Sequence, residues 1–240
     1  MPAQPPEQPA EPPPALVTLH LWTVPPRAVP LALGRMALDR VLLARTPGAR
    51  FRKMLGTGDG RTFTVRDADP LRWAALVAWD SAADAAAFER SATARAWRRA
   101  ASETLRAELR PLSSRGRWSG REPFGPAAGA PHAGPVASVT RARLRPGRAL
   151  SFWRAVPPVA AELRTVPGLR FAVGLGEAPL GYQGTFSLWE SADALSGFAH
   201  RGAAHRDVMV RTPREGWYAE ELFARFAVEG LEGTVDGRTP

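Results

Sequence analysis

The stretch TPGARFRKMLGTG at residues 46–58 recurs as VPGLRFAVGLG at residues 166–176, with its Pro-Gly and Arg-Phe pairs in register. A second match joins AALVAWDSAADAAAF at 74–88 to GTFSLWESADALSGF at 184–198. A third joins SRGRWSG at 114–120 to ARFAVEG at 224–230. Three matched blocks in the same order predict that the chain contains an internal duplication.

Each copy shows the order strand, helix, strand, strand, helix, strand. Two-residue alternation of apolar side chains predicts the first strands, at 15–22 and 136–144. Helical patterns follow near 27–44 and 147–164, and Pro157-Pro158 is expected to interrupt the second. This order is that of the split βαββαβ, ferredoxin-like unit. We therefore expect an α+β protein in which tandem duplicated ferredoxin-like repeats pack as a dimeric α+β barrel-like sandwich.

Composition shifts predict the domain boundaries. Residues 1–14 are half proline, which is typical of a disordered, solvated tail. The Gly-, Pro- and Ala-rich stretch at 122–135 is typical of a linker. It separates the first repeat, at 15–121, from the second, at 136–235, which holds the candidate cofactor site.

The charge and composition limit the possible functions. The 240 residues have a formal net charge of +9, but Lys53 is the one lysine, so arginine supplies nearly all the positive charge. The arginines are scattered, so we expect no nucleic-acid binding, while peripheral association with an anionic membrane surface stays open. The chain has no cysteine, which excludes disulfides and thiolate-bound metals. It shows no secretory signal and no long apolar run, and we expect a cytoplasmic location.

Among the four histidines, His205 has the most informative surroundings. It lies on a predicted stripe that faces the sheet and runs along the last helix of the second copy; the stripe comprises Leu195, Phe198, Gly202, His205 and Met209. On spacing alone, His205 is either a core histidine bonded to a carbonyl or the single imidazole ligand of a metal cofactor. One imidazole cannot hold bare zinc or non-haem iron, but it can hold haem, because the porphyrin supplies four further ligands.

Two other features remain open from the residues alone. Trp153 and Trp217 have no counterpart in the first copy, so they either belong to the core or line a hydrophobic cavity. Lys53 is either an ordinary surface cation or a binding residue. The sequence contains no HExxH, Walker A, GxSxG or GxGxxG motif.

Several segments together resemble the spheroidene monooxygenase family of acyclic carotenoid biosynthesis. They are ARTPGARFRKMLGTG at 44–58, PLSSRGRWSGREPF at 111–124, GAAHRDV at 202–208 and REGWYAEELFARFAV at 214–228. The resemblance covers nearly the whole chain apart from the proline-rich tail. It implies a haem-dependent oxygenase that converts a terminal methylene of an acyclic carotenoid to a ketone by successive hydroxylation.

The resemblance, together with the residue patterns above, gives a set of expected site residues and partners. The expected catalytic residues are Arg225 and Trp217, and the expected haem-binding residues are His205 as iron ligand, Gly202, Met209, Phe198 and Lys53. The implied cofactor is haem b, and the implied partners are a hydrophobic small-molecule substrate, dioxygen, an external electron donor and a second copy in a homodimer. Two alternatives stay open: a haem enzyme of the aldoxime-dehydratase type acting on a small nitrogen-containing substrate, and a cofactor-free module that binds a hydrophobic ligand.

Overall fold

The computed structural model describes residues 12–59, 65–125, 132–177, 182–201 and 203–240. Most of the predicted tail at 1–14 and the middle of the predicted linker at 122–135 therefore lie outside the described residues. Within them, no helix is both long enough and apolar enough to span a bilayer.

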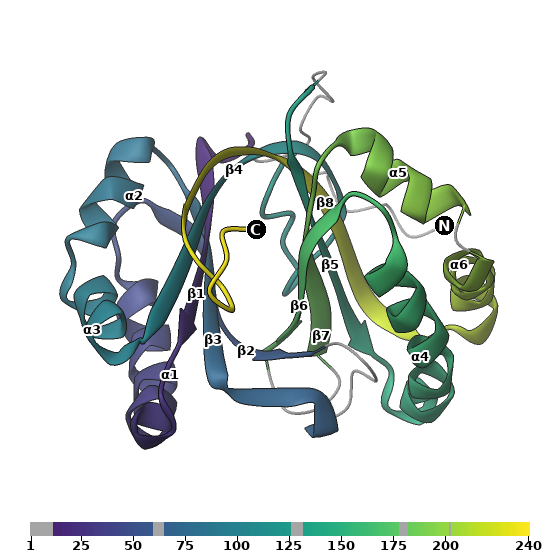
Figure 1. The fold of residues 1–240 in the computed structure, drawn as a ribbon, viewed down its shortest axis with the longest axis horizontal. Coiled ribbons are helices and arrows are strands. Elements are labelled where there is room, and N and C mark those ends of the chain that lie inside the picture. The colour runs from purple at the N-terminus through teal and green to yellow at the C-terminus, as the bar shows by residue number, and fades with distance from the viewer. Residues whose placement is uncertain (1–11, 60–64, 126–131, 178–181, 202) are drawn as a thin grey trace, which may run out of the picture.

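Two halves of the chain present the same order of elements (Figure 1). The first half comprises β1 (Leu16–Thr23), α1 (Val29–Ala44), β2 (Ala49–Gly58), β3 (Ala68–Trp79), α2 (Ala82–Glu89), α3 (Ala92–Ala100) and β4 (Glu103–Gly116). The second half comprises β5 (Val136–Leu144), α4 (Ala149–Thr165), β6 (Leu169–Gly176), β7 (Tyr182–Trp189), α5 (Ala192–Arg201), α6 (Ala203–Glu215) and β8 (Tyr218–Gly233). The predicted α+β class is confirmed.

The strands form one closed antiparallel barrel in the order β1-β3-β2-β6-β7-β5-β8-β4. One seam is short, since β2 pairs with β6 only through Gly56–Gly58 and Gly174–Gly176. The other seam is long, since β4 pairs with β8 from Leu105 to Gly116. The expected sandwich is thus a continuous barrel, because pairing the edge strands of both halves satisfies backbone groups that two stacked sheets would leave open.

The barrel interior is filled by apolar side chains from both halves. Alternate residues of every strand point inward, and they include Leu19, Leu76, Leu109, Val139, Phe186 and Phe226. Phe124, which lies in the predicted linker, is fully buried in this core. Its ring makes edge-to-face contacts with Phe51, at 6.2 Å between ring centres, and with Phe226, at 5.0 Å. The beginning of the predicted linker is therefore part of the core.

Short-range signals account for the helix starts and the tight turns. Ser81 accepts a hydrogen bond from the backbone N–H of Asp84 and donates its hydroxyl to the Asp84 carboxylate, which forms a capping box at the start of α2. The Pro-Gly turns place Gly48 and Gly168 at φ values of 70° and 83°, which favour glycine. A Cβ on Gly48 would also lie 2.3 Å from the Asp84 side chain.

Two predictions about the second half are wrong. The expected single last helix is divided into α5 and α6, so the stripe that includes Phe198 and Met209 does not run along one helix, and Met209 is 48% exposed. The expected break at Pro157-Pro158 does not occur, since α4 is continuous through both prolines. Both prolines are exposed, so water can bond the carbonyls that they leave without an N–H partner.

Candidate functional site

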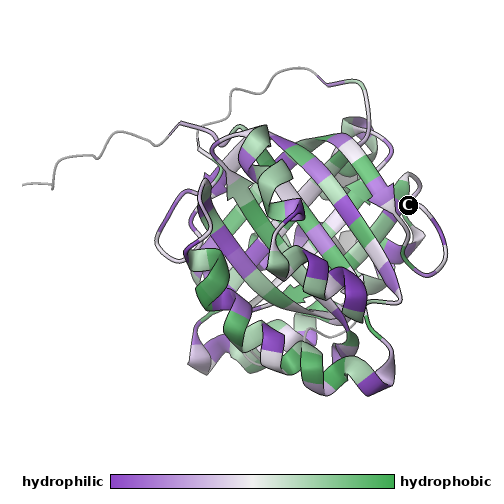
Figure 2. Ribbon diagram, turned by 90° about the vertical axis from the view of Figure 1, so that its left-hand side faces the viewer, coloured by the Kyte–Doolittle hydropathy of each residue, from purple (hydrophilic) through white to green (hydrophobic). Residues whose placement is uncertain are grey.

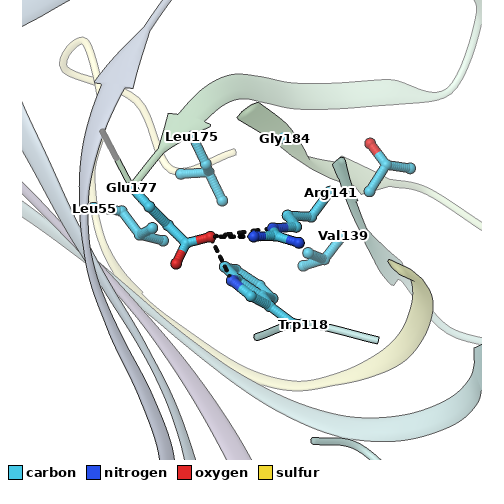
Figure 3. Close-up of a pocket in the computed structure, with 8 residues that line it drawn as sticks. Leu55, Trp118, Val139, Arg141, Leu175, Glu177 and Gly184 are labelled. Atoms are coloured by element: carbon cyan, nitrogen blue, oxygen red, sulfur yellow. Dashed lines mark hydrogen bonds and ion pairs between the residues drawn. The ribbon is translucent and has the colours of Figure 1, made fainter. Parts of the chain in front are cut away.

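A cluster of charged groups lies in the barrel, and Figure 3 shows two of its members, Arg141 and Glu177. Arg141 is buried, while Lys53, Glu177 and Glu220 are partly buried. The Glu177 carboxylate accepts hydrogen bonds from Lys53 Nζ at 2.6 Å, from Arg141 Nη2 at 2.8 Å and from Trp118 Nε1 at 2.7 Å. Arg141 also pairs with Glu220, whose carboxylate accepts the backbone N–H groups of residues 119 and 120. Two cations therefore face two carboxylates inside the barrel.

The balance of burial and charge keeps Glu177 ionised. Burial alone would raise the pKa of Glu177, but the hydrogen bond and charge of Lys53, with those of Arg141, hold it below its usual value. Lys53 also donates to Ser119 Oγ at 2.6 Å. The predicted cofactor residue Lys53 is therefore engaged within the barrel wall, on a different side of the sheet from α6.

The space enclosed beside this cluster is too small for an organic molecule. The void bounded by Leu55, Trp118, Val139 and Leu175 measures about 10 Å³, which is room for a single water. This void therefore has no room for a haem or a carotenoid.

A larger cleft opens on the outside, between α1 and β2. It measures about 490 Å³ and is lined by Arg40, Leu43, Ala44, Arg52, Lys53, Met54 and Glu177. That volume lies in the range of small-molecule sites. The cleft contains no imidazole, so it does not fit the predicted iron ligation.

In the first half, large side chains fill the layer between the outer face of the sheet and its helices. Trp22 stacks on Trp97 at 4.7 Å between ring centres, and His20 stacks on Trp22 at 5.5 Å. Met54 packs in the same layer and is 4% exposed. The Trp97 indole donates to the buried Asp39 carboxylate at 2.8 Å. The cleft between α1 and β2 adjoins this packing, since Leu43 and Met54 belong to both.

In the second half, the matching outward positions carry small residues. Strand pairing aligns Leu16 with Trp79 and Val136 with Trp189, which sets the correspondence between the halves. By that register, His20, Trp22 and Met54 of the first half correspond to Thr140, Ala142 and Gly174. We call Ser138, Thr140, Ala142, Ala172, Gly174, Thr185 and Ser187 the small-residue layer.

The helices of the second half cover this layer less completely than those of the first. Thr140 and Thr185 are partly exposed, whereas the matching His20 and Ala75 are 4% and 0% exposed. On α4, the Nε1–H of Trp153 is buried and has no hydrogen-bond partner among the described residues. Trp153 packs in a cluster with Val208 of α6. A buried donor without an acceptor is costly, so a ligand that accepts this hydrogen bond fits here.

The structure brings only some of the predicted residues near this layer. Trp217 is fully buried between α4 and β8, and its Nε1–H donates to Ser151 Oγ at 2.7 Å. Phe198 of α5 stacks on Trp189 at 5.6 Å. Arg225 is exposed on β8 and lies opposite Ser138 of the layer. The side chain of His205 and all of Gly202 lie outside the described part of the structure.

The Glu177 cluster was not expected from the sequence, although the sequence contains one indication of a buried charge. Along β5 the inward positions are Ala137, Val139 and Arg141, so a cation stands where alternation predicts an apolar residue. A buried arginine needs a carboxylate partner. No pattern indicates that Glu177 is that partner.

His20 is a buried core histidine, and it gives a prediction about acid stability. Burial, with the positive charges of Arg106 and Arg98, lowers the pKa of His20 to about 3. An unfolded histidine titrates near 6.5, so between these values the unfolded chain binds the extra proton and stability falls as pH falls. This contribution approaches about 1.4 kcal/mol per pH unit.

We expect His20→Gln to flatten this dependence. Urea unfolding at pH 7 and pH 5 measures how much the free energy of unfolding falls between these pH values. This fall should be smaller by about 1–2 kcal/mol in the variant than in the wild type. The same substitution at the partly buried His132, in the loop before β5, is the control. Equal losses in the wild type and His20→Gln would contradict the buried, neutral state of His20.

Comparisons with curated proteins identify several relatives. The chain is 37% identical to spheroidene monooxygenase from Rhodobacter capsulatus, with 89% of each chain covered. It is 36% identical to spheroidene monooxygenase from Rubrivivax gelatinosus, covering 93% of this chain and 86% of that protein. The protein of the same name from Cereibacter sphaeroides is 32% identical over 87% of this chain and 64% of its own length. No family model matches the chain.

Solved structures show a likeness in fold. An aldoxime dehydratase in complex with butyraldoxime has a TM-score of 0.61 at 10% identity, covering 89% of this chain and 79% of that one. A second aldoxime dehydratase structure has a TM-score of 0.59 at 12% identity, covering 89% and 80%. At these identities the likeness concerns the fold alone.

Proposed function

The chain belongs to the spheroidene monooxygenase family, and from that premise we propose that it is a haem-dependent monooxygenase of a hydrophobic, acyclic carotenoid-like substrate. The proposal takes haem b as the cofactor, dioxygen as co-substrate and an external electron donor. The proposal is supported by sequence identity of 32–37%, over most of the chain, to three proteins named spheroidene monooxygenase. We also infer that the halves arose by duplication, since they share one order of elements and three sequence blocks.

The observation that supports the cofactor is the small-residue layer of the second half. A flat macrocycle needs a gap between helix and sheet, and the first half fills that gap with Trp22, Trp97 and Met54. In the second half, Ala142 and Gly174 stand at positions that correspond to two of these residues. The same half holds His205, the one histidine for which iron ligation is predicted.

The helical register of α6 supports His205 as the ligand. Val208 of α6 packs against the cluster that contains Phe152 of α4, and Thr212, one turn later, is also partly buried. Thr212 follows His205 by seven residues, so the two positions differ by only about 20° around the helix axis. We therefore propose His205, whose position lies on the Thr212 side of α6, as the iron ligand.

Protein groups would hold and orient the cofactor at this place. His205 would bind the iron, and the Nε1–H of Trp153 would donate to a haem carboxylate or to bound substrate. Arg225 at the rim of the layer is the candidate for the second carboxylate. Bound haem would supply an iron centre that activates dioxygen. The apolar side chains of the Trp217 cluster would exclude water from the reacting carbon.

The overall reaction balances only with external electrons. Conversion of a methylene to a ketone by two hydroxylations consumes two dioxygen molecules, four electrons and four protons, and it releases three waters. The chain shows no motif for a flavin or nicotinamide, so a separate protein or reductant must supply the electrons.

The experiment that tests this function is turnover with and without dioxygen. Protein reconstituted with haem is incubated with an acyclic carotenoid and a reductant, and ketone formation is followed by absorbance and mass spectrometry. We expect product only when dioxygen and reductant are both present. Conversion of an aldoxime to a nitrile without dioxygen would support the aldoxime-dehydratase alternative, and protein that takes up no haem would support the binding module.

A further inference from the structure

The outer surface of α1 is apolar although no described residue covers it. The helix buries Ala32, Asp39 and Leu43 against the sheet. On its other side, every exposed position from Pro30 to Ala44 is apolar except Arg40. The large side chains there are Leu31, Leu33, Leu38, Val41 and Leu42, which are 57%, 56%, 52%, 49% and 38% exposed. Figure 2 looks onto this side and shows hydrophobic residues on α1, the helix along the lower edge.

The fold itself does not require this surface. The corresponding helix of the second half, α4, has one large exposed apolar side chain, Leu150. Its other exposed positions include Arg154 and Arg164. Contiguous exposed apolar side chains mark interaction sites, so the outer surface of α1 indicates a further partner.

The charges around α1 indicate the chemistry of that partner. Arg27, Arg40 and Arg45 are exposed at or beside the apolar surface. The one carboxylate of the segment, Asp39, is buried and pairs with Arg35 at 2.9 Å. The exposed side of α1 therefore carries cations and no anion.

We propose that α1 docks in the interface of an anionic phospholipid bilayer. Leucine and valine side chains would enter the boundary between headgroups and acyl chains, while the arginines would pair with lipid phosphates. The adjacent cleft adds Arg40 and Arg52 to the same basic rim. This inference goes beyond the proposed oxygenase function and depends neither on haem nor on turnover.

A second copy of this chain is the competing partner. Two α1 surfaces packed against each other would bring arginines from both copies together, with no exposed carboxylate on the helix to neutralise them. Repulsion between like charges at an apolar contact is unfavourable. An anionic lipid surface can both bury the leucines and pair its phosphates with the arginines.

Vesicle co-sedimentation tests the apolar contact. We expect the full chain to bind vesicles of phosphatidylcholine that contain one quarter phosphatidylglycerol, and to bind pure phosphatidylcholine at least tenfold more weakly. The double variant Leu31→Gln/Leu38→Gln should lower the partition coefficient at least tenfold, since two exposed apolar side chains no longer enter the lipid. Leu150→Gln on α4 removes a still more exposed leucine and should bind as the wild type does.

Two further variants test the charges and the contact site. Arg27→Gln/Arg45→Gln should weaken binding roughly fivefold per arginine, whereas Arg154→Gln on α4 should not. Because the chain lacks cysteine, a fluorescent label on Leu38→Cys reports its own environment. It should brighten and shift to the blue with anionic vesicles, whereas a label on Leu150→Cys should not change.

The opposite results would overturn the proposal. One is full-length protein that does not sediment with anionic vesicles at low salt. Another is equal loss of binding in Leu31→Gln/Leu38→Gln and Leu150→Gln. A third is a dimer in analytical ultracentrifugation that Leu31→Gln/Leu38→Gln dissociates without any vesicle binding, which would assign the surface to self-association.

Discussion

Replacing His205 with alanine is expected to weaken haem binding by roughly a hundredfold or more, since loss of an iron ligand costs more than loss of a group that only orients one. The measurement is the Soret absorbance of protein titrated with haem. Protein stability should change little, because α6 continues for ten residues beyond this position. Added imidazole should restore part of the absorbance by occupying the vacated place at the iron.

The control for this variant is His200→Ala, at a position five residues earlier on α5. It should bind haem as the wild type does. An unchanged spectrum in His205→Ala would remove His205 from the site, and loss of absorbance in His200→Ala alone would move the ligand to α5.

A large side chain placed in the small-residue layer tests whether haem occupies the space beside it. Ala142→Trp introduces into the second half the residue that the first half has at Trp22, and it should abolish haem uptake. Because Ala142 is buried, circular dichroism is used to check that the variant keeps its fold. Ala161→Trp, on the exposed side of α4, should bind haem normally. Full haem uptake by Ala142→Trp would show that the cofactor does not lie in this layer.

The second large effect concerns the charged cluster inside the barrel. Glu177→Ala is expected to destabilise the fold by about 3 kcal/mol, because it leaves the partly buried Lys53 beside Arg141 without the carboxylate between them. Urea unfolding near neutral pH measures the change. Glu229→Ala, which removes the exposed partner of Arg110, should cost less than about 1 kcal/mol.

A double variant separates charge from packing. If the unpaired cation causes the loss, Lys53→Met/Glu177→Gln should be more stable than Glu177→Ala, since one cation and one anion are then removed together. The lowered pKa of Glu177 also means that its contribution is present above the unfolded pKa and is lost as pH falls through the folded value. Glu177→Gln should reduce this part of the acid sensitivity. If Glu177→Ala unfolds as the wild type does, the cluster does not stabilise the barrel.

Local patterns predicted several element boundaries of the second half. The stretch around Trp189 and the following serine located a strand end and a helix start, because alternation and capping act over a few residues. The stripe that was expected to continue to Met209 failed, since the chain is divided between α5 and α6 and Met209 is exposed. Helical periodicity gives the angle between positions only while one helix continues.

The amino-acid sequence by itself determined the order of elements, the inward and outward faces of the strands, and the family to which the chain belongs. Only the tertiary structure decided that the strands close into one barrel, that Lys53 meets Glu177 across 124 residues of sequence, and that the outer face of α1 is uncovered. The reason is physical. Alternation and capping are set by neighbouring residues, whereas closure, ion pairing and exposure depend on which distant surfaces meet when the whole chain packs.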